Sequence, residues 1–126
     1  MKIYVAGKWE DRERVADIMR VLKGIGHEIT LDWSDHKYED EEYPQQYCQE
    51  DVQGVKDAEL YLGIFVAEYN YRGSLVEMGI ALGEGIPVWL LGDKADSCIF
   101  SNHPSVRRFR AWGELADAIA ELPTKG

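Results

Sequence analysis

The sequence is poor in cysteine, in positive charge and in long apolar runs. Among its 126 residues there are only two cysteines, and Cys48 and Cys98 form neither a C-x-x-C motif nor a disulfide framework, so we expect both to be reduced thiols. No apolar run approaches the roughly 18 to 20 residues of a membrane span, and the first residues read as a strand rather than a signal peptide. These absences predict a cytoplasmic protein with no membrane partner.

Positive charge is scarce, with 14 Lys and Arg against 23 Asp and Glu and a net charge of −9. Nucleic-acid binders gain affinity by placing Lys and Arg against phosphates, so no nucleic-acid polymer is expected as a partner. A small phosphorylated ligand is compatible with this charge, because one helix N-terminus and one basic residue can bind it. The length and the hydrophobic content of 45% predict a single domain over residues 1–126.

Apolar strand-like segments alternate with helical periodicity along the chain. Strands are predicted over 2–6, 27–31, 60–66, 87–91 and 106–109, and helices after the first strand and over 45–56, 72–82 and 112–122. This alternation predicts an α/β three-layer sandwich, with a five-stranded parallel sheet of flavodoxin-like or Rossmann-like type and helices on both faces.

The spacing also predicts which helix faces are buried. The expected core residues are Val15, Ile18, Met19, Leu22 and Ile25 in the first helix, and Cys48, Val52 and Val55 in the second, with Asp51 beside that stripe. Residues 32–44 are polar, acidic and aperiodic, which indicates a long loop and favours a mobile lid. The loop contains Asp32, Asp35, His36 and Asp40, but their spacing matches no known metal site, so no metal is expected.

In a parallel sheet the segments that follow the strands meet at one edge, where ligands bind. This places residues 7–12, the acidic loop and residues 70–77 together. Glu77 lies in the first turn of the helix after the third strand. Local chemistry favours a capping box, in which the Ser74 hydroxyl caps the helix and Glu77 reaches back to the Ser74 amide. The alternative is a functional carboxylate at the carboxyl end of a strand.

Three stretches resemble the nucleoside 2-deoxyribosyltransferase family, which includes the nucleotide N-glycosidases. Residues 3–7 followed by 10–12 are similar to the family's first strand and turn, and residues 50–55 to its Asp-bearing helix. Residues 73–87 match its Gly-x-x-x-Glu-x-Gly-x-Ala-Leu block, the most specific of the three. The stretches occur in the right order over most of the chain, so the resemblance implies a homologous fold.

The resemblance implies three catalytic residues and no cofactor. Glu77 would be the nucleophile that forms a glycosyl ester, as in retaining glycoside hydrolysis. Asp51 would be a second carboxylate that contacts sugar or base and moves the proton the departing base needs. Tyr4 would donate a hydrogen bond to the nucleophile. From the residues alone, Asp51 also fits a solvated helix charge and Tyr4 a core aromatic.

Further residues are expected to contact the substrate. They are Gly7, which lets a ligand approach the backbone, together with Lys8, Trp9, Trp33, Tyr71, Gly73 and Ser74. Trp9 and Trp33 either stack on a base or cover the sheet edge, whereas Trp89 is expected in the core. Tyr71 stands six residues before Glu77, where the transferases carry Asp and the glycosidases Ser. Lys8 or Arg72 would take over the contacts of the glycosidases' phosphate loop, whose pattern is absent here.

The family's sites are completed by a polar residue from a neighbouring subunit. Ser101 and Asn102 are the candidates, which implies a homodimer or a higher homo-oligomer. The expected activity is cleavage of the N-glycosidic bond of a nucleoside or deoxynucleoside, with transfer to another base or to water. The alternatives are a nucleoside 5′-monophosphate N-glycosidase and a non-catalytic nucleotide sensor on the same fold.

Overall fold

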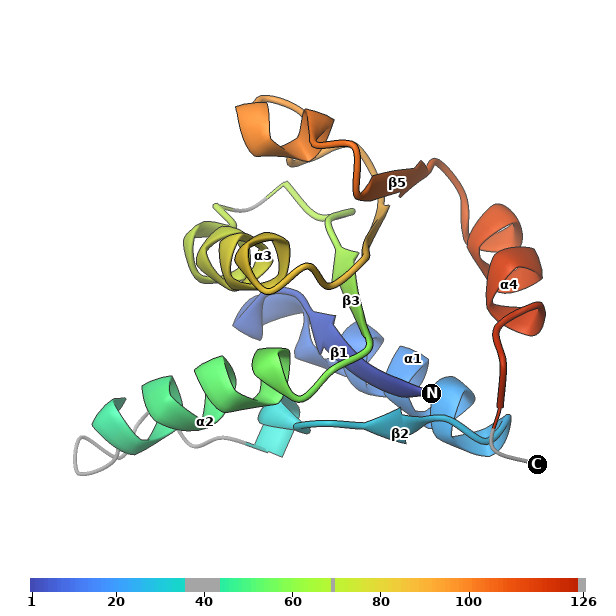
Figure 1. The fold of residues 1–126 in the computed structure, drawn as a ribbon, viewed down its shortest axis with the longest axis horizontal. Coiled ribbons are helices and arrows are strands. Elements are labelled where there is room, and N and C mark those ends of the chain that lie inside the picture. Colours follow the sequence, from blue (N-terminus) through green and yellow to red (C-terminus); the bar gives the residue numbers. More distant parts are fainter. Residues whose placement is uncertain (36–43, 69, 125–126) are drawn as a thin grey trace.

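The computed structural model describes residues 1–35, 44–68 and 70–124, which form one parallel sheet between two layers of helices (Figure 1). The strands are β1 (Lys2–Ala6), β2 (Glu28–Ile29), β3 (Leu60–Ile64), β4 (Val88–Leu91) and β5 (Val106–Phe109). They pair in parallel in the order β2-β1-β3-β4-β5, the flavodoxin-like order. The predicted fold class is therefore confirmed.

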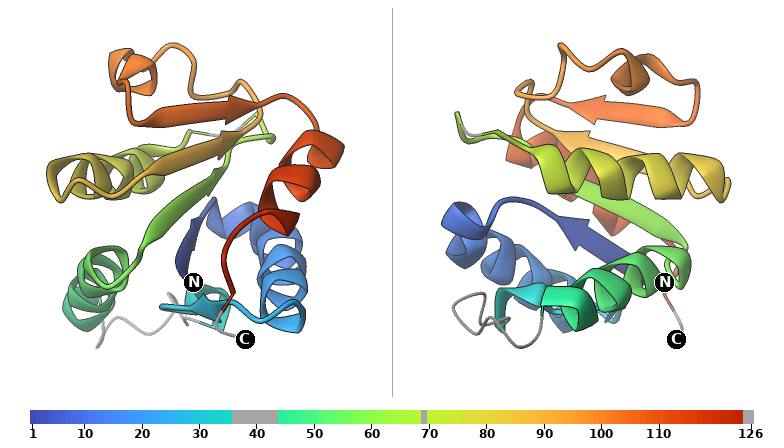
Figure 2. Two further views of the ribbon diagram at one scale, coloured as in Figure 1. Left: turned by 45° about the vertical axis from the view of Figure 1, so that its right-hand side comes forward. Right: turned by 90° about the vertical axis from the view of Figure 1, so that its left-hand side faces the viewer.

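Two helices cover each face of the sheet. As Figure 2 shows, α1 (Arg12–Gly24) and α4 (Trp112–Ala120) lie on one side, and α2 (Pro44–Lys56) and α3 (Arg72–Gly83) on the other. Short 3-10 turns follow three strands: η1 (Trp9–Asp11) after β1, η2 (Trp33–Asp35) after β2 and η3 (Ile99–Asn102) after β4. The three 3-10 turns thus lie at the edge of the sheet where the strands end.

The two central strands form the heart of the core. Every residue of β3 is buried, as are Ile3 to Ala6 of β1. The register pairs Tyr4 with Tyr61, whose rings stack with centroids 6.0 Å apart. Because buried phenol groups need hydrogen-bond partners, these two tyrosines must find acceptors in the helices above them.

Several predicted boundaries and faces differ from the structure. β2 has two residues and β3 ends at Ile64, while α4 ends at Ala120. Ile25 lies beyond the end of α1 and is 46% exposed. Cys48 and Val52 were expected in the core but are exposed, because their face of α2 borders a cavity rather than the sheet, and only Val55 of that stripe is buried.

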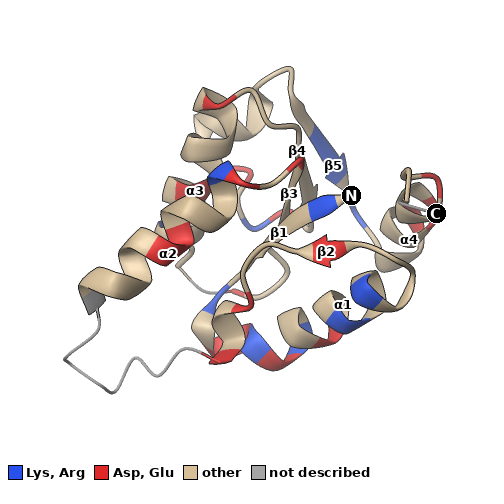
Figure 3. Ribbon diagram, turned by 60° about the horizontal axis from the view of Figure 1, so that its bottom comes forward, with Lys and Arg blue, Asp and Glu red and all other residues tan. Residues whose placement is uncertain are grey.

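The helix surfaces carry charges of both signs. Figure 3 shows Lys and Arg interleaved with Asp and Glu along α1, where Arg14 pairs with Asp11 and Arg20 with Asp17. Both side chains of the Arg20–Asp17 pair are exposed, so this pair contributes little to stability and marks a solvated face, whereas Asp11 is largely covered at the start of the helix. None of the helices in the described ranges is both long enough and apolar enough to cross a bilayer.

Candidate active site

A cavity of about 390 Å3 lies at the carboxyl ends of β1 and β3. Three parts of the chain supply its walls: the turn after β1, the α2 face beside η2, and the start of α3. The lining residues are Tyr4, Gly7, Lys8, Trp9, Glu10, Trp33, Cys48, Asp51, Val52, Asn70, Tyr71, Gly73, Ser74, Val76, Glu77 and Ile80. Trp33, near the start of the acidic loop, lines the cavity, whereas residues 36–43 lie outside the described ranges.

A carboxyl and a phenol form the centre of the cavity. Tyr4 Oη, on β1, donates a hydrogen bond to Glu77 Oε2, on α3. Burial raises the pKa of Glu77 to about 8; the Tyr4 bond opposes this rise and the charge of Asp51 adds to it. Burial and the charges of Glu77 and Asp51 raise the pKa of Tyr4 well above its ordinary value, so Tyr4 remains a donor. A carboxyl that titrates near neutral pH in a cavity is typical of a catalytic group.

The capping box expected at the start of α3 is wrong. The helix begins at Arg72, its N-cap Tyr71 makes no side-chain capping bond, and Ser74 already lies inside the helix. The Ser74 hydroxyl donates to the Gly7 carbonyl at 2.7 Å, and Glu77 accepts its bond from Tyr4. Glu77 thus binds β1 and Ser74 binds the residue that follows it, because β1 ends beside the first two turns of α3.

Asp51 lies beside the Tyr4–Glu77 pair rather than on a solvated face. It is half-buried on α2, and its charge raises the pKa of both Glu77 and Tyr4. Cys48 and Val52 share its helix face and also line the cavity. The structure thus brings two carboxylates from different helices to one hollow.

Aromatic rings form much of the wall. Trp33 is buried, and its Nε1 donates to the Val5 carbonyl at 2.7 Å, so it both seals the edge of β1 and faces the cavity. The Tyr71 hydroxyl accepts a bond from the Ala67 amide at 2.9 Å, and Lys8 Nζ lies 5.7 Å from the centroid of its ring. The wall therefore offers flat apolar surfaces with positive charge from Lys8 and Arg12 close to its rings.

A family model described as nucleoside 2-deoxyribosyltransferase matches residues 3–110. The chain belongs to this family. No curated protein matches it significantly.

Solved structures share the nucleoside 2-deoxyribosyltransferase fold of this chain. A 2-deoxyribosyltransferase from Bacillus psychrosaccharolyticus has a TM-score of 0.71 at 22% identity, covering 91% of this chain and 90% of its own. The CMP N-glycosidase BcmB of Clostridium botulinum has a TM-score of 0.70 at 18% identity, covering 95% and 98%. A conserved protein from Enterococcus faecalis V583 has a TM-score of 0.70 at 16% identity, covering 95% and 97%. At these identities the likeness shows the fold alone.

In this member of the nucleoside 2-deoxyribosyltransferase family, the packing of α1 explains why residue 7 is a glycine. A Cβ on Gly7 would lie 2.6 Å from Val15 Cγ2, so the approach of α1 to the end of β1 requires glycine. At Gly73 a Cβ would meet open space. Gly7 therefore lines the cavity and also allows α1 to pack closely.

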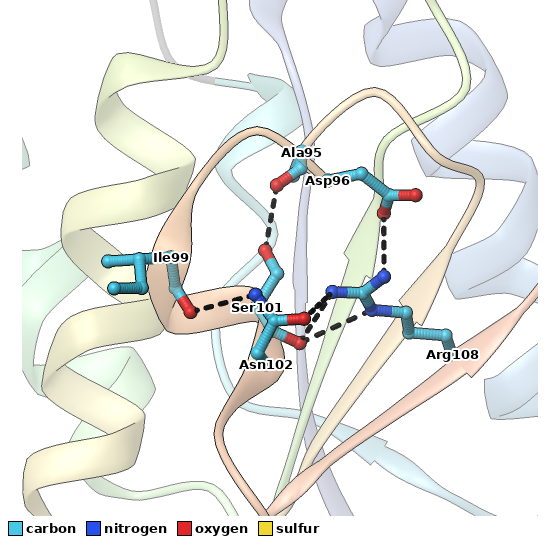
Figure 4. A network of polar contacts seen from close by, with 6 residues as sticks. All are labelled: Ala95, Asp96, Ile99, Ser101, Asn102 and Arg108. Carbon is cyan, nitrogen blue, oxygen red and sulfur yellow. Dashed lines mark hydrogen bonds and ion pairs between the residues drawn. The ribbon is translucent and has the colours of Figure 1, made fainter.

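Two predicted site residues lie outside this cavity. The Ser101 hydroxyl is buried and donates to the Ala95 carbonyl at 2.8 Å, so it stabilises the turn in which it lies (Figure 4). Arg108 holds that turn through the Ser101 carbonyl and Asn102 Oδ1, and also pairs with Asp96 at 3.2 Å. Asn102 is exposed on η3. Within one chain, neither side chain reaches Glu77.

Several lining residues were not predicted as site residues: Glu10, Cys48, Asn70, Val52, Val76 and Ile80. The i, i+3, i+4 spacing of Cys48, Asp51 and Val52 placed them on one face, but periodicity does not say whether a face meets a core or a hollow. In residues 1–35, 44–68 and 70–124, no group of three His, Cys, Asp or Glu could hold a metal ion. Of the loop cluster considered for a metal, His36 and Asp40 fall outside those ranges.

Proposed function

We propose that this protein cleaves the N-glycosidic bond of nucleosides or deoxynucleosides through a covalent glycosyl ester on Glu77. The observation that carries the proposal is the half-buried Glu77 carboxyl, bonded to Tyr4 and influenced by Asp51 within an aromatic-walled cavity. The cavity volume of about 390 Å3 lies within the range of small-molecule sites. Family membership supports the same class of substrate.

In the proposed reaction a Glu77 oxygen attacks the anomeric carbon as the bond to the base nitrogen breaks. The electron pair of that bond goes to the base, which takes a proton from Asp51. A second free base, or water, then attacks the same carbon and gives its proton to Asp51, and the ester bond breaks to return the Glu77 carboxylate. Because the pKa of Glu77 is about 8, about one tenth of it is ionised at pH 7 and activity rises with pH above that.

Lys8 favours a second candidate, a nucleoside 5′-monophosphate N-glycosidase. Its ammonium lies at the cavity wall, 5.7 Å from the centroid of the Tyr71 ring, so it would contribute positive charge beside a bound 5′-phosphate. The two candidates differ in product, since the second requires the phosphate and releases free sugar phosphate. In Lys8→Ala, activity on nucleotides should fall far more than activity on nucleosides.

The test is chromatographic detection of base release from a panel of nucleosides and 5′-monophosphates, with and without a second free base. Glu77→Gln should abolish turnover, and a glycosyl adduct on Glu77 should be trapped by mass spectrometry. Glu84→Gln is the matched control, because Glu84 follows the same helix and is exposed, 4.0 Å from Lys56. Survival of every compound at high enzyme concentration, together with tight nucleotide binding, would instead establish a non-catalytic sensor.

We further propose that Asn102 completes the site of a neighbouring subunit in a homodimer or higher homo-oligomer. Its support is the pair of exposed apolar side chains beside it on η3, with Ile99 76% and Phe100 62% exposed. At the cavity, Val76 of α3 is 66% exposed as well. Mixing inactive Glu77→Gln with inactive Asn102→Ala should restore turnover at sites that receive both intact residues. Native mass spectrometry must first show that hybrids form. Hybrids without activity would refute the shared site.

A further inference from the structure

Ser74 joins three elements around the cavity without using its hydroxyl on the cavity itself. Its Oγ donates to the Gly7 carbonyl at the end of β1, at 2.7 Å. Its own carbonyl accepts a bond from Tyr61 Oη of β3, at 2.6 Å. Ser74 is 4% exposed and Tyr61 is fully buried, so the Tyr61 bond is shielded from water, whereas the bond to Gly7 is part-buried at the edge of the cavity. The first turn of α3 is therefore fastened to both central strands.

Tyr61 is the counterpart of Tyr4 on the neighbouring strand. The two residues pair in register, their rings stack, and each hydroxyl reaches α3: Tyr4 at Glu77 and Tyr61 at Ser74, about one helical turn earlier. Burial and the charge of Glu77 raise the pKa of Tyr61 well above its ordinary value of 10.0, so its hydroxyl keeps its proton. Tyr61 thus holds the first turn of α3, which directly precedes Glu77.

The other bond of Ser74 holds the opposite wall. The Gly7 carbonyl precedes the turn of Lys8 and Trp9, both of which line the cavity. That turn is closed by the Asp11 amide on the Lys8 carbonyl at 3.0 Å, and Arg12 donates to the Trp9 carbonyl. Releasing the Gly7 carbonyl frees the start of this wall, while Glu77 keeps its bond to Tyr4.

We propose that Ser74 and Tyr61 are positioning residues with separable effects. The Ser74 hydroxyl fixes the Lys8–Trp9 wall and so sets substrate affinity. The Tyr61 hydroxyl fixes the first turn of α3, which precedes and orients Glu77, and so sets the rate of the chemical step. The assignment of affinity and rate rests on the proposed N-glycosidic activity. Two hydrogen bonds support the proposal, from the Ser74 hydroxyl to the Gly7 carbonyl and from the Tyr61 hydroxyl to the Ser74 carbonyl.

Ser74→Ala should raise KM roughly five- to tenfold, the equivalent of one lost hydrogen bond, and leave the midpoint of the pH–rate profile in place. Ser74→Thr, which keeps the hydroxyl, should restore KM. Tyr61→Phe should lower kcat roughly tenfold with KM near the wild-type value. In a Trp9→Ala background, the effect of Ser74→Ala on KM should shrink, because the wall through which it acts has already been removed.

Ile119→Val is the control for general loss of stability, since Ile119 is buried in α4 on the other face of the sheet. It should leave both kinetic constants unchanged. An unchanged KM in Ser74→Ala, or an unchanged kcat in Tyr61→Phe, overturns the corresponding assignment. If the effects of Ser74→Ala and Trp9→Ala on KM are fully additive, Ser74 does not act through the Lys8–Trp9 wall.

Amide hydrogen exchange tests the hydrogen bond between Ser74 and Gly7 independently of turnover. Peptides covering residues 7–11 should exchange at least about fivefold faster in Ser74→Ala than in wild type, and at the wild-type rate in Ser74→Thr. Equal rates in all three proteins would overturn the role of Ser74. If wild type turns over no nucleoside or nucleotide, the proposed function has failed; exchange and calorimetric binding of the same panel then decide the positioning role on their own.

Discussion

Tyr4→Phe tests whether the phenol of Tyr4 tunes the acidity of Glu77. The substitution removes the hydroxyl that donates to Glu77 Oε2 and keeps the ring that stacks on Tyr61. That bond favours the ionised carboxylate and therefore lowers the pKa of Glu77, against the effect of burial. A hydrogen bond to a charged group contributes about 1.5 to 3 kcal/mol, which corresponds to about one to two pKa units.

In the variant, the pKa of Glu77 should consequently rise from about 8 to about 9 or 10. At pH 7 the ionised fraction falls about 10- to 100-fold, and activity with it, if the carboxylate is the attacking group. Much of this loss should be recovered at high pH. The assay is kcat/KM for base release between about pH 6 and 10.5, compared with wild type. A midpoint that stays in place or moves to lower pH would refute the reasoning.

Three other outcomes follow from the structure. Because the pKa of Glu77 is raised to about 8, the wild-type protein loses stability as pH rises from about 4.5 through 8. Glu77→Gln should therefore be more stable than wild type by about 3 kcal/mol at pH 7 in denaturant titrations, and an equally stable variant would contradict this. His27 is buried, its Nδ1 accepts a hydrogen bond from the Met1 amine, and burial and the charge of that amine lower its pKa. The melting temperature should therefore fall as pH drops through about 6.5, and His27→Leu should remove this dependence. Gly7→Ala should destabilise by about 1 to 3 kcal/mol through its clash with Val15, and Val15→Ala should relieve part of that cost; additive losses would count against the clash.

Hydrophobic periodicity was sufficient to predict the sheet, the helices and the edge where the cavity lies. It could not predict what a helix face meets: Cys48 and Val52 share the stripe of Val55, yet only Val55 enters the core. Local chemistry also misled at α3, since Ser74 and Glu77 match a capping box in sequence. Their real partners, Gly7 and Tyr4, are 67 and 73 residues away in the chain, and no local pattern contains such contacts.

The direct pairing of Tyr4 with Tyr61 makes the site a reporter of strand register. Successive side chains of a strand point to opposite faces, so a slip of one residue between β1 and β3 would turn Tyr4 away from α3 and toward α1. Such a misfolded chain would keep most of its apolar contacts and its helical content, but it would have no phenol at Glu77. After refolding, the specific activity per mole of compact protein would therefore measure the fraction of molecules whose central strands are correctly aligned, which circular dichroism cannot do.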